Sequence, residues 1–269
     1  MAERKAIFIT GGGSGIGRAV AIHFARQGWF VGIGDINRKG LEVTREMMQS
    51  GFSYIHEFDV RDRAAWDEAL KGFSIAAGGR IDVLFNNAGI ARGGPLPDNP
   101  VGDVEQVLDI NLKGVIYGAQ AAYPYLKKSA PGSMLLNTAS LAGIVGSPGL
   151  AVYCATKFAV RGLTESLDAE WAADGIKVAS LCPGFIDTPI IEQVPQGTNE
   201  TMKDRLRSAG VEISPVADVP PVVWAAVHGS EQHYLVGKTA RRLNFLKRWM
   251  PGKVRKEMRQ RGITAGENS

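Results

Sequence analysis

The stretch Thr10-Gly11-Gly12-Gly13-Ser14-Gly15-Ile16-Gly17 follows a short apolar run, Ala6–Ile9, and leads into a segment of helical periodicity. Glycines permit a tight turn and let backbone amides approach an anion with no Cβ in the way. The start of the next helix adds unpaired N–H groups and the positive end of its dipole. Structural turns also collect glycine, but the position between a strand and a helix favours a pyrophosphate-binding loop.

The rest of the chain continues this alternation of short apolar runs and longer helical stretches. Further apolar runs are Phe30–Ile33, Tyr54–Val60, Ile81–Phe85, Met134–Asn137, Lys177–Leu181 and Tyr234–Val236. The helix candidates between them are Ile16–Gln27, Lys39–Ser50, Ala64–Ala77, Val104–Lys127 and Val152–Ala173. Apolar strands separated by helices predict a parallel sheet covered on both faces. With right-handed crossovers, this is an α/β fold with a single doubly wound sheet of the Rossmann type.

Beyond Pro183 the alternation weakens. The segment Asp187–Ser214 is polar, rich in turn residues, and holds one weak helix candidate near Glu200–Ser208. A long irregular segment in a compact domain is typical of a lid or a disordered loop, so we predict a substrate lid at about residues 187–214. A short helix near Val219–Val227 and the last strand complete one catalytic domain, residues 1–237, because no linker marks a second one.

Composition restricts the class of protein. The 269 residues are 45% hydrophobic and 22% charged, which is typical of a globular protein. No apolar stretch approaches the ~20 residues that span a bilayer, and the first residues lack a signal peptide's apolar core. We therefore expect a cytoplasmic enzyme. Cys154 and Cys182 are too few for a disulfide scaffold, and the four histidines lack metal-ligand spacing, so we expect no metal.

Residues 238–269, here called the tail, carry the positive charge. Ten Lys and Arg residues stand against one acid between Lys238 and Arg261, whereas the whole chain has a net charge of +4. Nucleic-acid binding is not expected, because Phe245 and Trp249 provide little of the interleaved aromatic surface that base stacking needs.

The tail also has the periodicity of amphipathic helices interrupted at Pro251. Its apolar side chains recur at spacings of three and four: Leu243, Leu246, Met250, Val254 and Met258, with Phe245 and Trp249 adjoining. This stripe either packs on the enzyme body or on a partner subunit, or it provides peripheral contact with an anionic membrane.

Asp35 ends the second apolar run, 18 residues after Gly17. An acid at this position accepts hydrogen bonds from the adenosine ribose hydroxyls of a dinucleotide. The 2′-phosphate of NADP would meet the carboxylate, so we expect NAD. Arg18 and Arg38 are the residues that could reverse this preference, and Asp35 could also be a simple turn former at a strand end.

Tyr153 and Lys157 are four residues apart at the start of a helix candidate. This spacing puts a phenol and an ammonium on one helix face. Tyrosine, with an unperturbed pKa of about 10, is a poor base at neutral pH. A nearby cation lowers that pKa toward the range useful for acid–base chemistry, so the pair is a candidate for proton transfer. The same spacing also occurs by chance on solvated helix faces.

Several motifs occur in one order over about residues 5–190. After the glycine-rich loop come Asn86-Asn87-Ala88-Gly89, Ser140 thirteen residues before Tyr153, the Tyr153-x-x-x-Lys157 pair, and Pro183-Gly184 with Thr188 beyond. Together they resemble the short-chain dehydrogenase/reductase family, whose members transfer a hydride between a nicotinamide nucleotide and a small-molecule substrate.

The resemblance implies four catalytic residues. Tyr153 would be the acid/base on the substrate oxygen, and Ser140 would orient that oxygen. Lys157 would bind the nicotinamide ribose and lower the pKa of Tyr153, and Asn111 would hold a water that relays protons. The implied cofactor-binding residues are Gly11, Ser14, Gly15, Ile16, Gly17, Asp35, Asp59, Val60, Asn87, Ala88, Gly89, Tyr153, Lys157, Pro183, Gly184, Ile186 and Thr188.

We therefore interpret the chain as an oxidoreductase that transfers a hydride between NAD and a secondary alcohol or ketone. A lipophilic substrate is favoured by the apolar residues of the predicted lid: Ile190, Ile191, Val194, Met202 and Leu206. One alternative is an NADP-dependent carbonyl reductase. Another is a catalytically silent, nicotinamide-sensing regulatory protein, which would not need an intact acid/base pair.

The resemblance also implies a homodimer or homotetramer. Many family members close a tetramer interface with an Asp-Gly-Gly turn after the last strand, whereas here Tyr234–Gly237 is followed by Lys238-Thr239-Ala240 and the tail. This departure puts the tetramer in doubt. The long helix candidates Val104–Lys127 and Val152–Ala173 would still form the dimer interface common in the family.

Overall fold

Seven parallel strands form one sheet in the computed structural model, which describes residues 4–194 and 199–267, with side chains through Gln260. The strands are β1 (Ala6–Thr10), β2 (Phe30–Asp35), β3 (Ser53–Glu57), β4 (Val83–Asn86), β5 (Ser133–Thr138), β6 (Ile176–Pro183) and β7 (His233–Val236). Their order, β3-β2-β1-β4-β5-β6-β7, reverses between β1 and β4, which confirms the predicted doubly wound sheet.

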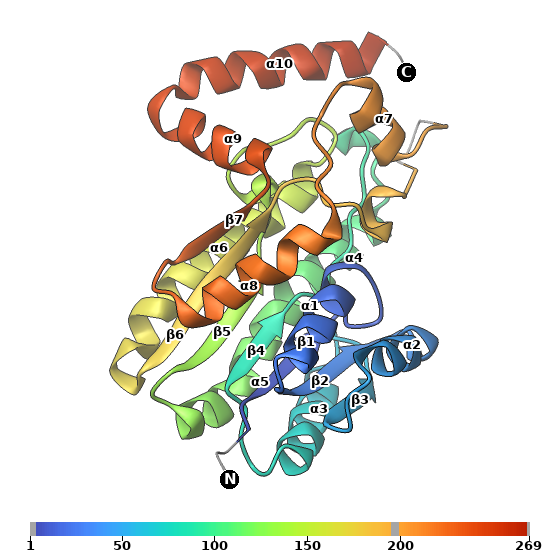
Figure 1. Ribbon diagram of the computed structural model, residues 1–269. Coiled ribbons are helices and arrows are strands. Elements are labelled where there is room, and N and C mark those ends of the chain that lie inside the picture. The colour runs from blue at the N-terminus through green and yellow to red at the C-terminus, as the bar shows by residue number, and fades with distance from the viewer. Residues whose placement is uncertain (1–3, 195–198, 268–269) are drawn as a thin grey trace.

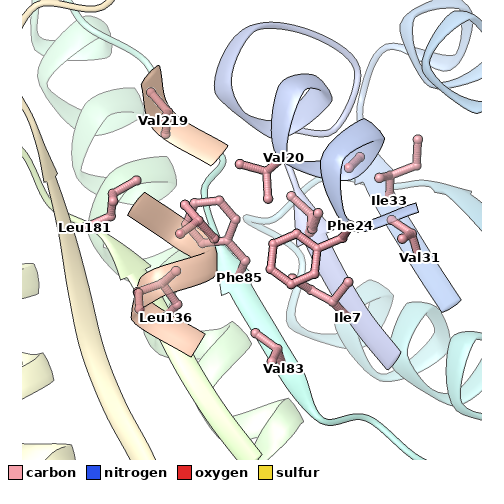
Figure 2. Packing of buried hydrophobic residues seen from close by; sticks show 14 of the residues in the cluster. Ile7, Val20, Phe24, Val31, Ile33, Val83, Phe85, Leu136, Leu181 and Val219 are labelled. Atoms are coloured by element: carbon pink, nitrogen blue, oxygen red, sulfur yellow. The ribbon is translucent and has the colours of Figure 1, made fainter. Parts of the chain in front are cut away.

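Helices cover both faces of the sheet. On one face lie α1 (Gly15–Arg26), α2 (Arg38–Met48) and α8 (Val219–His228), and on the other lie α3 (Arg63–Ala76), α5 (Gly114–Ser129) and α6 (Ala151–Trp171). Side chains alternate along each strand: Ile7 and Ile9 of β1 pack under α1 and α8, whereas Phe8 packs toward α3. Figure 2 shows the apolar core between the sheet and helices α1 and α8, with Phe24 of α1 against the strands. Strands buried on both faces explain their continuous apolar runs.

The predicted helix Val104–Lys127 is not uniform. It consists of α4 (Val101–Leu108), a π-helical turn at Asp109–Lys113, and α5. A π-turn inserts an extra residue into the helical ladder and is frequent at functional sites. The hydrophobic periodicity of the sequence does not show this interruption.

The remaining helices lie beyond the carboxyl ends of the strands, opposite the N-terminus (Figure 1). They are α7 (Met202–Ser208), α9 (Lys238–Trp249) and α10 (Pro251–Glu267), the last longer than the short helix expected after Pro251. The predicted lid contains α7 and a 3-10 turn, Pro189–Ile191. Residues 195–198 of that lid lie outside the described residues. No described helix is long and apolar enough to cross a membrane.

The tail packs on the enzyme body. Leu243, Leu246 and Val254 are at most 9% exposed and join a third apolar cluster with residues such as Leu141 and Val160. Among the apolar tail side chains that the structure describes, those of Phe245 (61%), Trp249 (65%) and Met250 (45%) remain exposed. The apolar stripe of the tail therefore packs on the enzyme body, which was one of the roles considered for it. Met250 does not take part in this packing.

Candidate active site

The carboxyl ends of β1 and β4 are joined at the point where the strand order reverses. The Thr10 hydroxyl accepts hydrogen bonds from the backbone N–H groups of Asn87 (3.0 Å) and Ala88 (3.1 Å). The Asn87 amide donates in turn to the Thr10 carbonyl at 2.9 Å. Ligands of doubly wound sheets bind outside such a switch point. A cleft of about 860 Å³ opens here.

The glycine-rich loop has a shape that only glycine allows. Gly11 and Gly15 have positive φ values of 66° and 50°. A Cβ on Gly17 would lie 2.2 Å from the Gly11 carbonyl oxygen, and one on Gly11 would lie 3.0 Å from the Ala88 Cα. Gly11, Gly15 and Ser14 line the cleft at the start of α1. These residues fit the pyrophosphate of a dinucleotide, because the loop leaves room for the anion beside the helix N-terminus.

Asp35, at the end of β2, fixes the loop from the side. Its carboxylate accepts hydrogen bonds from the backbone N–H groups of Gly13 and Asn37, each at 3.0 Å. Asp35 lines the cleft next to Ile36, an apolar side chain that is 68% exposed. The carboxylate therefore lies in the cleft beside the glycine-rich loop, its contact with a ribose stays a prediction, and Ile36 is a candidate adenine contact that the sequence analysis missed.

The two arginines considered as NADP-binding residues are engaged elsewhere. The Arg18 guanidinium donates to the Thr44 hydroxyl at 3.0 Å and to the Gly13 carbonyl. Arg38 pairs with Glu42 one helical turn along, at 2.9 Å, on an exposed face of α2. Neither arginine lines the cleft.

Asp59 and Val60 also line the cleft, and their contact with an adenine, which the family resemblance implies, stays a prediction. The carboxylate of Asp59 is already paired with the Arg61 guanidinium at 2.6 Å, and this hydrogen bond holds the pKa of Asp59 below its ordinary value. The Val60 carbonyl accepts from the Trp66 indole at 3.0 Å. Val60 is thus held in place and offers an apolar side chain on the cleft wall.

Ser140, Tyr153 and Lys157 meet at the middle of the cleft. Ser140 follows β5, where its hydroxyl accepts from the Ala142 N–H at 3.1 Å, and the other two lie on the first turns of α6. Lys157 is only 3% exposed, and its ammonium donates to the Thr138 carbonyl at 2.8 Å. The same nitrogen lies 5.6 Å from the centre of the Tyr153 ring.

Burial shifts the pKa values of Tyr153 and Lys157 in opposite directions. Burial raises the pKa of Tyr153 to about 12, and the hydrogen bond with Ser140 opposes this shift. Burial also lowers the pKa of Lys157 to about 8. Desolvation dominates the shift of Tyr153, and the ammonium of Lys157 is directed at the Thr138 carbonyl, so the expected lowering of the Tyr153 pKa by Lys157 stays a prediction.

Asn111 lies in the π-helical turn and is fully buried. Its side-chain carbonyl accepts from the Ile90 N–H at 2.9 Å, and its amide donates to the Ile90 carbonyl at 2.8 Å. A Cβ on Gly89 would lie 3.2 Å from the Asn111 oxygen and 3.7 Å from the Lys157 nitrogen. Asn111 therefore clamps the Gly89–Ile90 segment behind the cleft, and the water that it was expected to hold stays a prediction.

The structure gathers nearly all of the expected site residues. Every residue implied in cofactor binding lines the cleft except Gly17, which packs beneath the loop, and every implied catalytic residue lines it except Asn111. Of the predicted lid residues, Ile190, Ile191, Val194 and Met202 line the cleft, whereas Leu206 is buried away from it. The apolar lining at this end is consistent with a ligand that is partly apolar.

The sequence analysis missed the contribution of the tail. Thr239, Leu243 and Met258 also line the cleft. The start of α9 is tied to the lid segment, because Glu212 accepts hydrogen bonds from the Thr239 N–H at 2.8 Å and the Thr239 hydroxyl at 3.0 Å. The amphipathic stripe indicated that the tail packs on something, but no local pattern shows that part of this surface is the substrate end of the cleft.

Arg92 was also missed. It lines the mouth of the cleft and donates to Gln193 at 3.1 Å and Gln106 at 3.2 Å, with Asp103 3.5 Å away. It thereby links α4 to the lid segment. No motif singles out this arginine in the sequence.

Comparison with known proteins agrees with this geometry. The sequence matches the short chain dehydrogenase family over residues 5–199. The chain belongs to the short-chain dehydrogenase/reductase family. It is 37% identical over 206 residues to a 3-oxoacyl-(acyl-carrier-protein) reductase of Thermotoga maritima, covering 76% of this chain and 83% of that protein. It is 36% identical over 211 residues to a 3-alpha-(or 20-beta)-hydroxysteroid dehydrogenase of Mycobacterium tuberculosis, covering 78% and 79%.

Solved short-chain dehydrogenases share the fold. A family member from Burkholderia phymatum, solved in complex with NAD, superimposes with a TM-score of 0.82 at 27% identity and covers 92% of this chain and 95% of that one. The protein is thus a nucleotide-binding oxidoreductase of a family that binds NAD(H) or NADP(H), acts on small molecules and is commonly oligomeric.

Proposed function

We propose that the protein interconverts a lipophilic secondary alcohol and its ketone with NAD. The observation that carries this proposal is the meeting of Ser140, Tyr153 and Lys157 in a cleft whose other end is the glycine-rich loop. Conversion of the alcohol to the ketone moves a hydride from carbon to the nicotinamide and releases one proton. The nucleotide supplies only the hydride chemistry, so the chain must bind, orient and handle the proton.

Tyr153 is the proton carrier in this proposal. At neutral pH its phenol is protonated, since its pKa is about 12, and it can donate to a carbonyl oxygen during reduction. In the opposite direction the phenol proton must leave toward Lys157 as the Tyr153 oxygen accepts the proton of the alcohol. Ser140, whose hydroxyl bonds to Tyr153, orients the same substrate oxygen. Lys157 and Asn111 both lie beside Gly89, and in this proposal they would lead the proton out.

The preference for NAD rests on Asp35. The carboxylate lines the cleft, so a 2′-phosphate would meet a negative charge, and Arg61, an arginine of the same lining, is paired with Asp59. Both candidate arginines have other partners. An NADP-dependent reductase is the alternative that this arrangement disfavours.

The proposal of a lipophilic substrate rests on the apolar residues that line one end of the cleft. The lining there includes Ile190, Val194, Met202, Leu243 and Met258. Two similar proteins are named for an oxoacyl and a hydroxysteroid substrate, both partly apolar. A third, a meso-2,3-butanediol dehydrogenase of Serratia marcescens at 30% identity, is named for a small polar diol, so the family alone does not decide the class.

The test is a panel of secondary alcohols and ketones of graded hydrophobicity, assayed with NAD(H) and NADP(H). We expect turnover with NAD and rising kcat/KM along the apolar series. Tyr153→Phe should lower kcat by ~10²–10⁴, the range for a positioned acid/base, while NADH binding measured by fluorescence stays near wild type. A protein that binds NADH but converts no substrate would instead support the silent regulatory alternative.

Asp35→Asn is the matched test of the nucleotide preference, because it keeps the shape and removes the charge. The NAD/NADP ratio of kcat/KM should fall by about tenfold or more, since hydrogen bonds to charged groups contribute ~1.5–3 kcal/mol. A wild-type enzyme that prefers NADP would contradict the proposal.

We also propose that the enzyme forms at least a homodimer through α4, α5 and α6. These helices carry exposed apolar side chains, among them Leu108 (36%) and Phe158 (44%). Sedimentation velocity of the wild type and Phe158→Glu tests this assembly. A cytoplasmic location and a peripheral membrane contact through Phe245 and Trp249 stay predictions.

A further inference from the structure

A second cavity, here called the groove, lies beside the active-site cleft. It has a volume of about 880 Å³ and is bounded by the loop after Ser140, the start of α6 and the junction of α9 with α10. Its apolar lining includes Pro148, Ala151 and Cys154. The Cys154 thiol accepts from the Ser147 N–H at 3.4 Å, which holds the loop against α6.

Three cationic side chains line the groove: Lys247 of α9, and Arg255 and Arg259 of α10. None of the described residues that line it is acidic. Within the described part of the chain, these three cations make no ion pair, in contrast to Arg242 of the same tail, which lies 3.9 Å from Glu257. The groove is therefore positively charged on its tail side and apolar on its floor, which complements an amphiphilic anion.

The groove and the cleft share a wall. Val145, Ser147 and Met258 line both cavities. Tyr153 faces the cleft, and its neighbour Cys154 faces the groove, because consecutive residues of a helix point about 100° apart. Met258 therefore borders both the cleft that holds Tyr153 and the groove that holds the three cations, and a ligand that binds in both must pass beside it.

We propose that the groove binds the anionic group, a carboxylate or a phosphate, of the same substrate whose apolar part occupies the cleft. The substrate is then an amphiphilic oxo or hydroxy compound, with its reacting carbon and its anion separated by an apolar segment. The inference rests on the proposed alcohol/ketone chemistry and adds the charge of the substrate. Arg255 and Arg259 offer planar guanidinium groups, which bind carboxylates and phosphates with paired hydrogen bonds.

The experiment compares straight-chain oxocarboxylates of increasing length with their methyl esters, which have the same chain but no charge. At the length that fits, wild-type kcat/KM for the acid should exceed that for the ester by about tenfold or more, the factor for a hydrogen bond to a charged group. Decanoate and decyl phosphate, tested as inhibitors against decanol, then distinguish a carboxylate from a phosphate subsite.

Two triple variants with the same change of net charge complete the design. The acid/ester ratio should fall toward one in Lys247→Gln/Arg255→Gln/Arg259→Gln. It should stay at the wild-type value in the control Arg241→Gln/Lys253→Gln/Lys256→Gln, whose side chains are exposed on the same helices but line neither cavity. A fall confined to the groove variant supports the proposal, because a general charge effect would lower both.

Three outcomes would overturn it. The first is a wild-type ratio near one at every chain length, and the second is an equal fall in both triple variants. The third is sedimentation on anionic vesicles that is lost in the groove variant while its acid/ester ratio stays at the wild-type value, which would assign these cations to a membrane surface. If neither acid nor ester is converted, it is the alcohol/ketone proposal that fails, and the groove proposal is tested by binding alone.

Calorimetric titration of decanoate into the wild type and the groove variant then decides whether the anion site exists.

Discussion

The two ends of the cleft are built in different ways. The nucleotide end consists mainly of backbone and glycine: Gly11, Gly15 and Gly89 line it, and hydrogen bonds between Thr10 and Asn87 close its floor. The substrate end consists of side chains from segments far apart in the sequence, such as Ile191 and Met258.

This contrast explains what each end can be adapted to do. Backbone sterics hold the nucleotide end to one shape, which suits a ligand whose pyrophosphate does not vary. At the substrate end, single side chains of the lid and the tail set the size and polarity of the cavity without disturbing the sheet. Short-chain dehydrogenases with different substrates are consistent with such a division.

The most disruptive test of this contrast is Gly17→Ala. The added Cβ would lie 2.2 Å from the Gly11 carbonyl oxygen, which belongs to the backbone and cannot rotate away. The loop must shift, and we expect kcat/KM for the nucleotide to fall on the order of 100-fold, with overpacking costing ~1–3 kcal/mol of stability. Gly102→Ala, in a helix with nothing within 4 Å of the new Cβ, is the control: it should leave nucleotide kinetics unchanged and raise stability by at most ~1 kcal/mol, the helix preference of alanine over glycine. Wild-type nucleotide kinetics in G17A would show that the loop can shift to make room for the Cβ without losing its function.

The substrate end should respond more mildly. Leu243 is 5% exposed and lines the cleft, so Leu243→Ala should cost ~2–3 kcal/mol of stability, at the lower part of the range for buried leucines, because the cavity opens into the cleft. Nucleotide KM should stay unchanged, while kcat/KM for the bulkiest ketone of the panel rises relative to the smallest. Phe245→Ala, on the exposed side of the same helix, should stay within about 0.5 kcal/mol of wild type. Equal losses in the two variants would contradict the packing of the tail.

The same contrast separates what the sequence predicts from what it does not. The seven strands, the loop and the order of motifs are local patterns, so residues such as Gly11, Asp35 and Tyr153 could be placed in one cleft from the sequence. The third strand ends at Glu57, before the predicted Val60, because Asp59 and Val60 turn into the cleft. That departure, like Met258, depends on tertiary contacts that no local pattern encodes.

The pKa values of the acid/base pair are among the properties that the sequence does not predict. The spacing of Tyr153 and Lys157 predicts that they share a helix face, and they do. Their titration depends on how deeply each is buried and on the Thr138 carbonyl, which is 19 residues away from Lys157. Desolvation shifts both groups toward their neutral forms, a result that sequence spacing cannot give.

Lys157, at the boundary between the two ends, provides the last and smallest test. Its pKa falls from the ordinary 10.5 to about 8 in the folded protein, so between these values the unfolded chain binds more protons. The free energy of unfolding should therefore rise as pH increases from about 8 to 10.5, and below pH 8 the buried charge costs up to ~3 kcal/mol. Lys157→Met removes this charge but leaves the Thr138 carbonyl without its donor, which offsets ~1–3 kcal/mol.

We therefore expect K157M without nucleotide to be at most ~2 kcal/mol more stable than wild type at neutral pH, with the difference shrinking above pH 8 and reversing in sign by pH 10.5. Urea unfolding at both pH values measures it, and Lys256→Met, exposed on α10, is the control that should show no such slope. The same pH dependence in K157M and wild type would mean that the folded protein does not hold Lys157 in a desolvated site. The charge would then be as well accommodated as at the surface, and the boundary between the two ends of the cleft would be open to water.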